Sequence, residues 1–189
     1  PDTPAMENLR LVFDADWYGE RYPDARGGED GALAHYVEVG DAAGHWPHPL
    51  FDPEFYSEQH PELARESGAR LEHYVQVGEK QGSWPNGLFD PLFYLRETPD
   101  LAGFPEPLLV HFSRYAAFEI RRPNPLFDLV WYRGQRKRAG VPEANPLVEY
   151  MESGDRDGLS PHPLFDPACY GSQHPELPAR GGARPAHYL

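Results

Sequence analysis

A phenylalanine-aspartate pair recurs along this chain at a fixed interval of 38 residues, and that interval constrains the fold more than any other feature. The pairs occupy positions 13–14, 51–52, 89–90, 127–128 and 165–166. A tyrosine keeps the same register at Tyr18, Tyr56, Tyr94, Tyr132 and Tyr170. Self-similarity at such a period is the signature of a repeat architecture. We therefore divide the chain into a leader (1–12), four full repeats (13–50, 51–88, 89–126 and 127–164) and a partial fifth (165–189).

Each repeat opens with the signals of a helix N-terminus. In the second repeat Asp52 is a suitable N-cap, and Pro53 falls at the first helical position, where its missing N–H costs nothing. Phe51 precedes the cap and Tyr56 lies at the fourth helical position, which together form a hydrophobic staple. Pro61 ends this helix, because proline disfavours helical geometry in the residue before it. The sequence thus predicts a short first helix of about two turns.

The fourth repeat departs from this pattern, since Lys137 stands where the others have the terminating proline. We expect its first helix to run on to Gly140.

A second helix follows in each repeat, marked by apolar residues and glycines at helical spacing. In the first repeat these positions are Leu33, Tyr36, Val37, Gly40 and Gly44. They lie along one side of a helix with 3.6 residues per turn. We interpret the later glycine as a left-handed C-cap at Gly44, Gly82 and Gly158, and the earlier one as a point where a neighbouring helix approaches closely.

An extended, polyproline-like connector at residues 46–50 then leads to the next repeat. No strand-type alternation occurs. We therefore expect an all-α fold in which tandem helix-pair repeats of 38 residues form a short α-solenoid or a compact helical array.

Composition agrees with a folded protein and excludes several classes. Glycine and proline make up 40 of the 189 residues, yet 25 residues are aromatic, and disordered chains lack such apolar surface. The mean hydropathy of −0.67 and the lack of any apolar run near 18 residues exclude a membrane span. A single cysteine excludes a disulfide scaffold and a cysteine-based zinc site. The net charge of −13 argues against nucleic acid as a partner, because phosphate binding needs a basic surface.

The sequence begins at Pro1 without an initiator methionine and stops at Leu189, inside a predicted helix. We expect it to be a piece of a longer protein, so the absence of a targeting segment carries little information.

The repeat motifs point to a known family. The run from His48 to Tyr56 (HPLFDPEFY), the HPEL of residues 60–63 and the LEHY of residues 71–74 resemble a bacterial repeat of the type FDPxYY followed by PLxHYLxxG. Such repeats occur beside glycosyltransferase domains in proteins that build surface polysaccharides, including rhamnan-synthesis-type proteins. A looser relative occurs in large secreted calcium-binding repeat proteins. The resemblance covers nearly all of 13–189 and carries over no catalytic residue.

Two repeats depart from that family pattern. Ala116 and Ile120 replace the two glycines in the third repeat, and Glu149 replaces the histidine of the second helix in the fourth.

Several polar residues have the types found in active sites, and we interpret each as structural. One histidine per repeat (His35, His73, His111 and His187) cannot converge on one metal, because packed helices lie about 8–10 Å apart and zinc ligands about 2 Å from the ion. We expect these histidines to pack or hydrogen-bond between repeats.

The triplets Asp14-Ala15-Asp16 and Asp155-Arg156-Asp157 match the D-x-D motif of many glycosyltransferases. That chemistry needs carboxylates at a strand end that hold a divalent cation, whereas these lie at predicted helix ends. No calcium-loop spacing occurs either. Cys169 shares its position with Trp17, Phe55, Phe93 and Trp131 and is expected to be a buried small hydrophobe. We predict no metal, no cofactor and no catalytic residue in this segment.

The feature that the repeat explains least is a basic segment. Residues 113–138 carry seven basic and two acidic side chains (net +5), whereas residues 1–112 carry seven and 21 (net −14). Arginine forks suit phosphates, carboxylates and acidic partner surfaces. The candidate anion- or partner-binding residues are Arg121, Arg122, Arg133, Arg136, Lys137 and Arg138. The alternative is a solvated surface whose charges are paired locally.

The resemblance implies a non-catalytic helical-repeat scaffold or binding module of a bacterial surface-polysaccharide glycosyltransferase. It would position acceptor glycan or partner domains, and its partners would be a glycosyltransferase domain of the same or another chain and a polysaccharide. Trp46 and Trp84 are the candidate sugar-stacking residues. A cytoplasmic location follows from this interpretation. The alternatives are a structural or adhesion repeat of a secreted bacterial protein and, from a third class, an enzyme.

Overall fold

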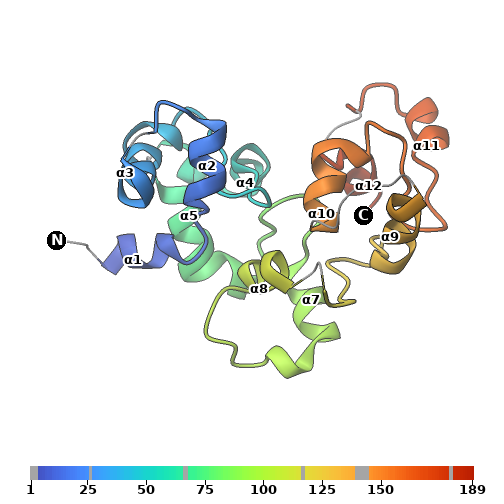
Figure 1. The fold of residues 1–189 in the computed structure, drawn as a ribbon, viewed down its shortest axis with the longest axis horizontal. Coiled ribbons are helices and arrows are strands. Elements are labelled where there is room, and N and C mark those ends of the chain that lie inside the picture. The colour runs from blue at the N-terminus through green and yellow to red at the C-terminus, as the bar shows by residue number, and fades with distance from the viewer. Residues whose placement is uncertain (1–3, 26, 66–67, 116–117, 139–144, 179–180) are drawn as a thin grey trace. The chain divides into compact units, whose positions relative to one another are not determined.

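The computed structural model describes every residue except 1–3, 26, 66–67, 116–117, 139–144 and 179–180, and this part consists of short helices joined by turns and loops (Figure 1). No strand occurs among the described residues. The expected all-α class is therefore confirmed, while the stacking of all repeats into one solenoid stays a prediction. None of the described helices is long and apolar enough to cross a bilayer.

Each repeat contributes a first helix directly after its Phe-Asp pair. These helices are α2 (Ala15–Arg21), α4 (Pro53–Gln59), α7 (Pro91–Glu97), α9 (Leu129–Arg138) and α11 (Pro167–Gln173). Short 3-10 turns follow two of them, η2 (Pro61–Arg65) and η4 (Pro99–Leu101). The leader adds a helix of its own, α1 (Pro4–Arg10), which packs against the second helix of repeat 2.

The second helices begin as α-helices, and three of them continue as one π-helical turn. The α-helical parts are α3 (Gly28–His35), α5 (Ala69–His73), α8 (Leu108–Tyr115), α10 (Pro146–Glu149) and α12 (Ala183–Tyr188). The π-helical turns are η1 (Tyr36–Gly40), η3 (Tyr74–Gly78) and η5 (Tyr150–Gly154), and a last short helix, α6 (Glu79–Gln81), follows η3. The first and second helices therefore alternate along the chain as the sequence predicts.

The first helices start as the capping signals require. The Asp52 carboxylate accepts hydrogen bonds from the amides of Glu54 and Phe55 at 3.0 and 3.1 Å. The rings of Phe51 and Tyr56 meet with centroids 5.1 Å apart, which confirms the hydrophobic staple. In repeat 4, α9 reaches Arg138 and has 10 residues against seven in α4. Its predicted end at Gly140 lies outside the described residues.

Glycines shape the second helices in two ways. Gly44, Gly82 and Gly158 have φ of 75°, 88° and 73°, which confirms the predicted left-handed C-caps. The earlier glycine of the same helices lies against the hydroxyl of a tyrosine from the first helix. A Cβ built on Gly78 would lie 2.2 Å from the Tyr56 hydroxyl. The close approach predicted for this position is therefore made by a side chain.

Each repeat closes on itself through its connector. The amide of the capping aspartate donates to the carbonyl of a connector proline 33 residues later, at 2.8 Å between Asp52 and Pro85 and at 3.0 Å between Asp90 and Pro123. The connector of repeat 2 also bonds to repeat 1, since the Asn86 side chain donates to the Leu50 carbonyl at 2.7 Å. The connector thus joins one repeat to the next.

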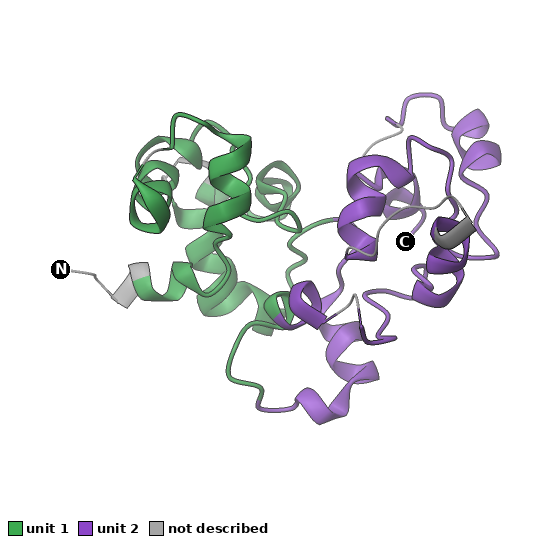
Figure 2. Cartoon of the chain, in the orientation of Figure 1, with its two compact units in different colours: residues 1–86, 104–110 green, residues 87–103, 111–189 purple. Residues whose placement is uncertain are grey.

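The chain forms two compact units, shown in green and purple in Figure 2. Compact unit 1 comprises residues 1–86 and 104–110, and compact unit 2 comprises residues 87–103 and 111–189. The division runs through repeat 3 and through α8 itself. Repeat 3 is also where the two glycines of the second helix are replaced: Ile120 is exposed there, and Ala116 lies outside the described residues.

Candidate functional site

The recurring polar residues meet in one arrangement inside the repeats. A tyrosine of the first helix bonds the histidine 17 residues later on the second helix. The hydroxyl-to-Nδ1 distances are 2.9 Å for Tyr18–His35, 2.7 Å for Tyr56–His73, 3.0 Å for Tyr94–His111 and 2.7 Å for Tyr170–His187. The structural role predicted for these histidines agrees with the geometry, but their location was predicted wrongly. Each bond connects the two helices of one repeat, because the tyrosine and its histidine belong to the same repeat.

Repeat 4 replaces this hydrogen bond with an ion pair. Glu149 takes the place of the histidine and pairs with Arg136 of α9 at 2.7 Å. The Tyr132 hydroxyl is buried and has no hydrogen-bond partner among the described residues.

Repeat 1 holds the largest of these clusters. The Tyr18 hydroxyl also lies 3.1 Å from Nδ1 of His45, whose ring stacks on Tyr22 with centroids 3.9 Å apart. Burial, together with the neighbouring His35, lowers the pKa of His45. Burial likewise raises the pKa of Tyr18 well above the usual value of a tyrosine, with smaller contributions from Tyr22 and Asp41, so the phenol stays protonated. Tyr18 thus bonds both histidines of this cluster, His35 and His45.

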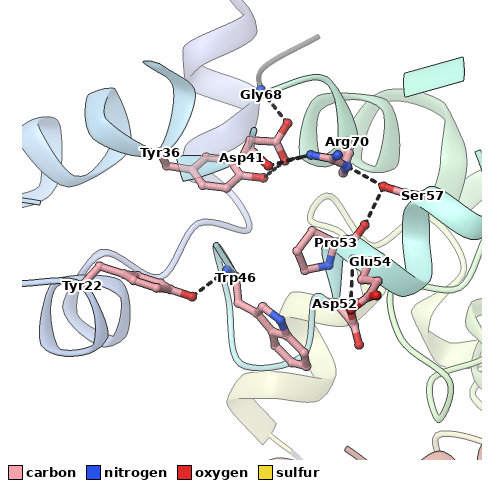
Figure 3. A network of polar contacts seen from close by, with 10 residues as sticks. All are labelled: Tyr22, Tyr36, Asp41, Trp46, Asp52, Pro53, Glu54, Ser57, Gly68 and Arg70. Atoms are coloured by element: carbon pink, nitrogen blue, oxygen red, sulfur yellow. Dashed lines mark hydrogen bonds and ion pairs between the residues drawn. The ribbon is translucent and has the colours of Figure 1, made fainter. Parts of the chain in front are cut away.

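A second recurring polar feature joins consecutive repeats, and the sequence analysis missed it. Asp41 follows η1 and is fully buried, where it accepts hydrogen bonds from the Tyr36 hydroxyl at 2.9 Å and the Gly68 amide at 2.7 Å. Arg70 of the next repeat pairs with it at 2.9 Å (Figure 3). Arg70 also donates to the Ser57 hydroxyl at 2.6 Å. One buried carboxylate thus holds the second helix of repeat 2 against that of repeat 1, and we call this arrangement the acid clamp.

The acid clamp recurs one repeat later with different donors. Glu79 accepts from the Tyr74 hydroxyl at 2.6 Å and from the amides of Leu108 and Leu109 at 2.8 and 3.1 Å. Leu108 stands where repeat 2 has Arg70, so Glu79 bonds the next repeat through its backbone amides. Burial raises the pKa of Glu79.

The third acid clamp is incomplete. Asp155 is fully buried at the end of η5, and Arg184 lies 3.6 Å from it. Neither carboxylate oxygen accepts a hydrogen bond from the described residues, and the Tyr150 hydroxyl is also without a partner among them. Burial raises the pKa of Asp155.

A sequence signal for the clamps exists. Acids recur in one register at Asp41, Glu79 and Asp155, while repeat 3 has Ala117 there, which lies outside the described residues. The sequence analysis followed the aromatic, proline and glycine registers and did not test the acidic ones.

The predicted sugar-stacking residues both lie in compact unit 1 and are half-buried. The Trp46 amide donates to the Tyr22 hydroxyl at 2.9 Å, as Figure 3 shows. Gln59 holds the backbone of Trp84 with two hydrogen bonds, 2.8 Å to its carbonyl and 3.1 Å from its amide. Both indoles are therefore carried on fixed backbone and retain exposed surface.

The predicted basic residues lie in compact unit 2, and three of them, Arg121, Arg122 and Arg136, bond to other residues of the chain. Arg121 pairs with Asp100 at 2.8 Å and also with Glu119. Arg122 donates to the Pro125 carbonyl and lies over the Phe93 ring, 5.9 Å from its centroid.

Two of the four remaining basic candidates also have partners within the chain. Arg136 is occupied by Glu149, and Arg133 also has an interaction partner. The side chains of Lys137 and Arg138 lie outside the described part of the chain. Local pairing, the alternative interpretation of this segment, thus describes Arg121 and Arg136, and anion or partner binding stays a prediction.

The remaining candidates from the sequence are the D-x-D aspartates and Cys169. Asp14 caps α2 by accepting from the Trp17 amide at 3.0 Å, in agreement with its structural interpretation. No group of acids, histidines or cysteine in the described residues is arranged to hold a metal ion. The prediction that Cys169 is buried is wrong, because its side chain is exposed. Exposure at this position varies between repeats, since Trp131 is also exposed whereas Phe93 is buried.

Comparison with protein-family models, with curated proteins and with solved structures found no match. The resemblance described above therefore rests on the repeat motifs themselves.

Proposed function

We propose that this chain is a non-catalytic helical-repeat module that serves a bacterial surface-polysaccharide glycosyltransferase as a scaffold or glycan-binding element. One observation supports this most directly: most of the polar side chains that recur along the repeat register are bonded to one another. The Tyr56–His73 bond of 2.7 Å and the Asp41–Arg70 pair of 2.9 Å tie helices together. A general base or nucleophile would need to be free to bond a substrate, whereas these groups are bonded to each other.

The aromatic connectors supply the binding surface in this proposal. Trp46 and Trp84 have the same place in successive repeats and remain half-exposed on hydrogen-bonded backbone. Flat indole faces pack on the apolar faces of sugar rings, and two of them at a repeat spacing suit a polymer of repeating units.

Titration with oligosaccharides of rhamnose-rich bacterial surface polysaccharide, followed by indole NMR signals, tests glycan binding. We expect shifts of the Trp46 and Trp84 signals and a loss of binding in Trp46→Ala and Trp84→Ala. Trp131→Ala in compact unit 2 is the matched control and should retain binding. Unshifted Trp46 and Trp84 signals at saturating oligosaccharide would refute the glycan-binding form of the proposal, and turnover of a nucleotide sugar by the purified chain would refute its non-catalytic form.

A further inference from the structure

Two large side chains beside the first helix of repeat 5 are exposed, although the matching side chains of the other repeats are buried. Leu164, directly before the Phe-Asp pair, is 88% exposed, and Tyr188 on α12 is 61% exposed. The matching leucines are at most 9% exposed, and the matching aromatic residues are fully buried. They are Leu50, Leu88 and Leu126 for the first position, and Tyr36, Tyr74, Phe112 and Tyr150 for the second. The other repeats therefore show what covers such a pair.

The surface that carries this pair already has the geometry of a complete repeat. The rings of Phe165 and Tyr188 have centroids 5.7 Å apart and an interplanar angle of 68°. The matching rings of repeat 2, Phe51 and Tyr74, have 5.5 Å and 67°. A preformed surface loses little conformational entropy on binding. We call the surface formed by Leu164, Asp166 and Tyr188 the Leu164–Tyr188 face.

The Leu164–Tyr188 face also has two backbone groups without partners. In repeat 2 the connector bonds both groups of this kind: the Pro85 carbonyl accepts from the Asp52 amide at 2.8 Å, and the Asn86 side chain donates to the Leu50 carbonyl at 2.7 Å. The matching groups of the face have no hydrogen-bond partner among the described residues. They are the Asp166 amide and the Leu164 carbonyl. The face thus offers one donor and one acceptor beside its apolar side chains.

The end of the second helix supplies the rest of the cover in a complete repeat. In repeat 2 the Tyr74 hydroxyl donates to Glu79 at 2.6 Å. Gly78 leaves room for the Tyr56 hydroxyl, since a Cβ built there would lie 2.2 Å from it. The helix end and the connector that cover this region in repeat 2 lie together in residues 76–87.

We propose that the Leu164–Tyr188 face binds a peptide segment with the pattern of residues 76–87, which is the end of a second helix with its connector. The segment would accept from the Asp166 amide, donate to the Leu164 carbonyl and present an acid to the Tyr188 hydroxyl. Segments of this pattern in a folded copy are held within their own repeats, so the occupant is one that is free of such contacts. The inference goes beyond the proposed function, because binding is measured without glycan and neither result depends on the other.

Joining residues 76–87 to the chain directly after Leu189 tests the fit, because Gln76 matches the position that follows Leu189 in the repeat register. The link makes binding intramolecular, so a weak contact is still populated. We expect hydrogen exchange of the Asp166 amide, followed by NMR, to slow about tenfold or more. We also expect the urea midpoint to rise.

The same tail with Gly78→Val is the matched control. Its larger side chain would collide with the Tyr170 hydroxyl, as the Cβ on Gly78 would with Tyr56 in repeat 2. This tail should leave the Asp166 amide unprotected.

Variants of the face itself locate the contact. Tyr188→Ala in the joined chain should remove most of the protection of Asp166, whereas Leu92→Ser, which changes another exposed apolar side chain of compact unit 2, should leave it unchanged. An Asp166 amide that exchanges in the joined chain as in the parent would overturn the proposal, as would equal protection by the Gly78→Val tail. Far-UV circular dichroism establishes that every variant is folded.

Discussion

At the scale of single residues, the repeats depend on how closely a tyrosine hydroxyl approaches the second helix. Gly40, Gly78 and Gly154 allow this approach, since a Cβ on any of them would lie 2.2 to 2.7 Å from a tyrosine oxygen. The hydroxyl is then close enough to bond the histidine of the same helix, as Tyr56 does with His73. The glycine and the histidine occur together in repeats 1 and 2. Repeat 3 keeps the Tyr94–His111 bond with Ala116 in place of the glycine, and repeat 4 keeps Gly154 without the histidine.

Replacing Gly78 by alanine should therefore destabilise the protein. The added Cβ collides with the Tyr56 hydroxyl at 2.2 Å and displaces it from His73. We expect a loss of about 1–3 kcal/mol in the free energy of unfolding, measured by urea denaturation. Gly19→Ala in α2 is the matched control: nothing lies within 4 Å of its built Cβ, so it should be neutral or slightly stabilising. Equal effects of the two variants would contradict this account.

His48 should make the protein less stable in acid. Burial lowers its pKa to about 3, and its Nδ1 accepts the Leu50 amide at 3.0 Å, so the folded state holds it neutral. The unfolded chain protonates it near pH 6.5, and the stability that the neutral histidine contributes is therefore present above that pH and lost as the pH falls toward 3. For this one group the loss is about 2 kcal/mol at pH 5.

His48→Asn installs the residue of repeats 2 and 3, where Asn124 accepts the Leu126 amide at 2.7 Å in the same way. We expect this variant to lose less stability than the parent between pH 7 and pH 5 in denaturant titrations at each pH. His162→Asn, at the half-buried matching position, controls for the removal of one histidine. An unchanged pH dependence in His48→Asn would contradict the assignment.

At the scale of helices, the acid clamp decides how one second helix meets the next. Asp41 bonds to the amide of Gly68, which directly precedes α5, and to Arg70 within it. Glu79 bonds to the amides of the first two residues of α8. A negative charge is favourable at a helix N-terminus, where the first amides lack partners, so the acid of one repeat completes the helix start of the next.

Removing the clamp charge should be costly when its cation remains. Asp41→Asn leaves Arg70 without a counter-ion in a mostly buried site, and we expect a loss of about 3 kcal/mol in the free energy of unfolding. Asp41→Glu combined with Arg70→Leu installs the Glu79–Leu108 combination of the following junction and should cost less than the single change. Thermal and urea unfolding of both variants measure the difference. A double variant that is less stable than Asp41→Asn would show that the two clamps are not equivalent.

At the scale of the whole molecule, repeat 3 divides what the sequence presents as one uniform array. The register of 38 residues continues through it without an insertion, yet the boundary between the two compact units falls inside its second helix. This repeat has lost the C-cap glycine and the clamp acid, since Ile120 and Ala117 stand in their places. The two compact units should therefore unfold separately when one is weakened.

Tryptophan fluorescence can test this separation. In Trp131→Phe the remaining tryptophans, Trp17, Trp46 and Trp84, all lie in compact unit 1. Adding Gly78→Ala weakens that unit alone, so fluorescence should report a midpoint at lower urea concentration than the final circular-dichroism transition. A single transition that coincides for both probes would contradict independent unfolding.

The helix pairs, their caps and the ends of the first helices follow from local sequence. These depend on residues close together in the chain, such as Asp52, Pro53 and the left-handed Gly82, and local backbone preferences suffice to predict them. It also indicated that the recurring histidines are structural. Which partner each polar group meets depends on the tertiary structure. His73 bonds a tyrosine of its own repeat, whereas Asp41 bonds the backbone of the next repeat.

The exposure of Cys169 and the local pairing of Arg121 were likewise decided by the tertiary structure, because burial and ion pairing depend on residues distant in the chain. A repeat register predicts which positions are equivalent. It does not give the packing around them, and the partners of a polar side chain follow from that packing.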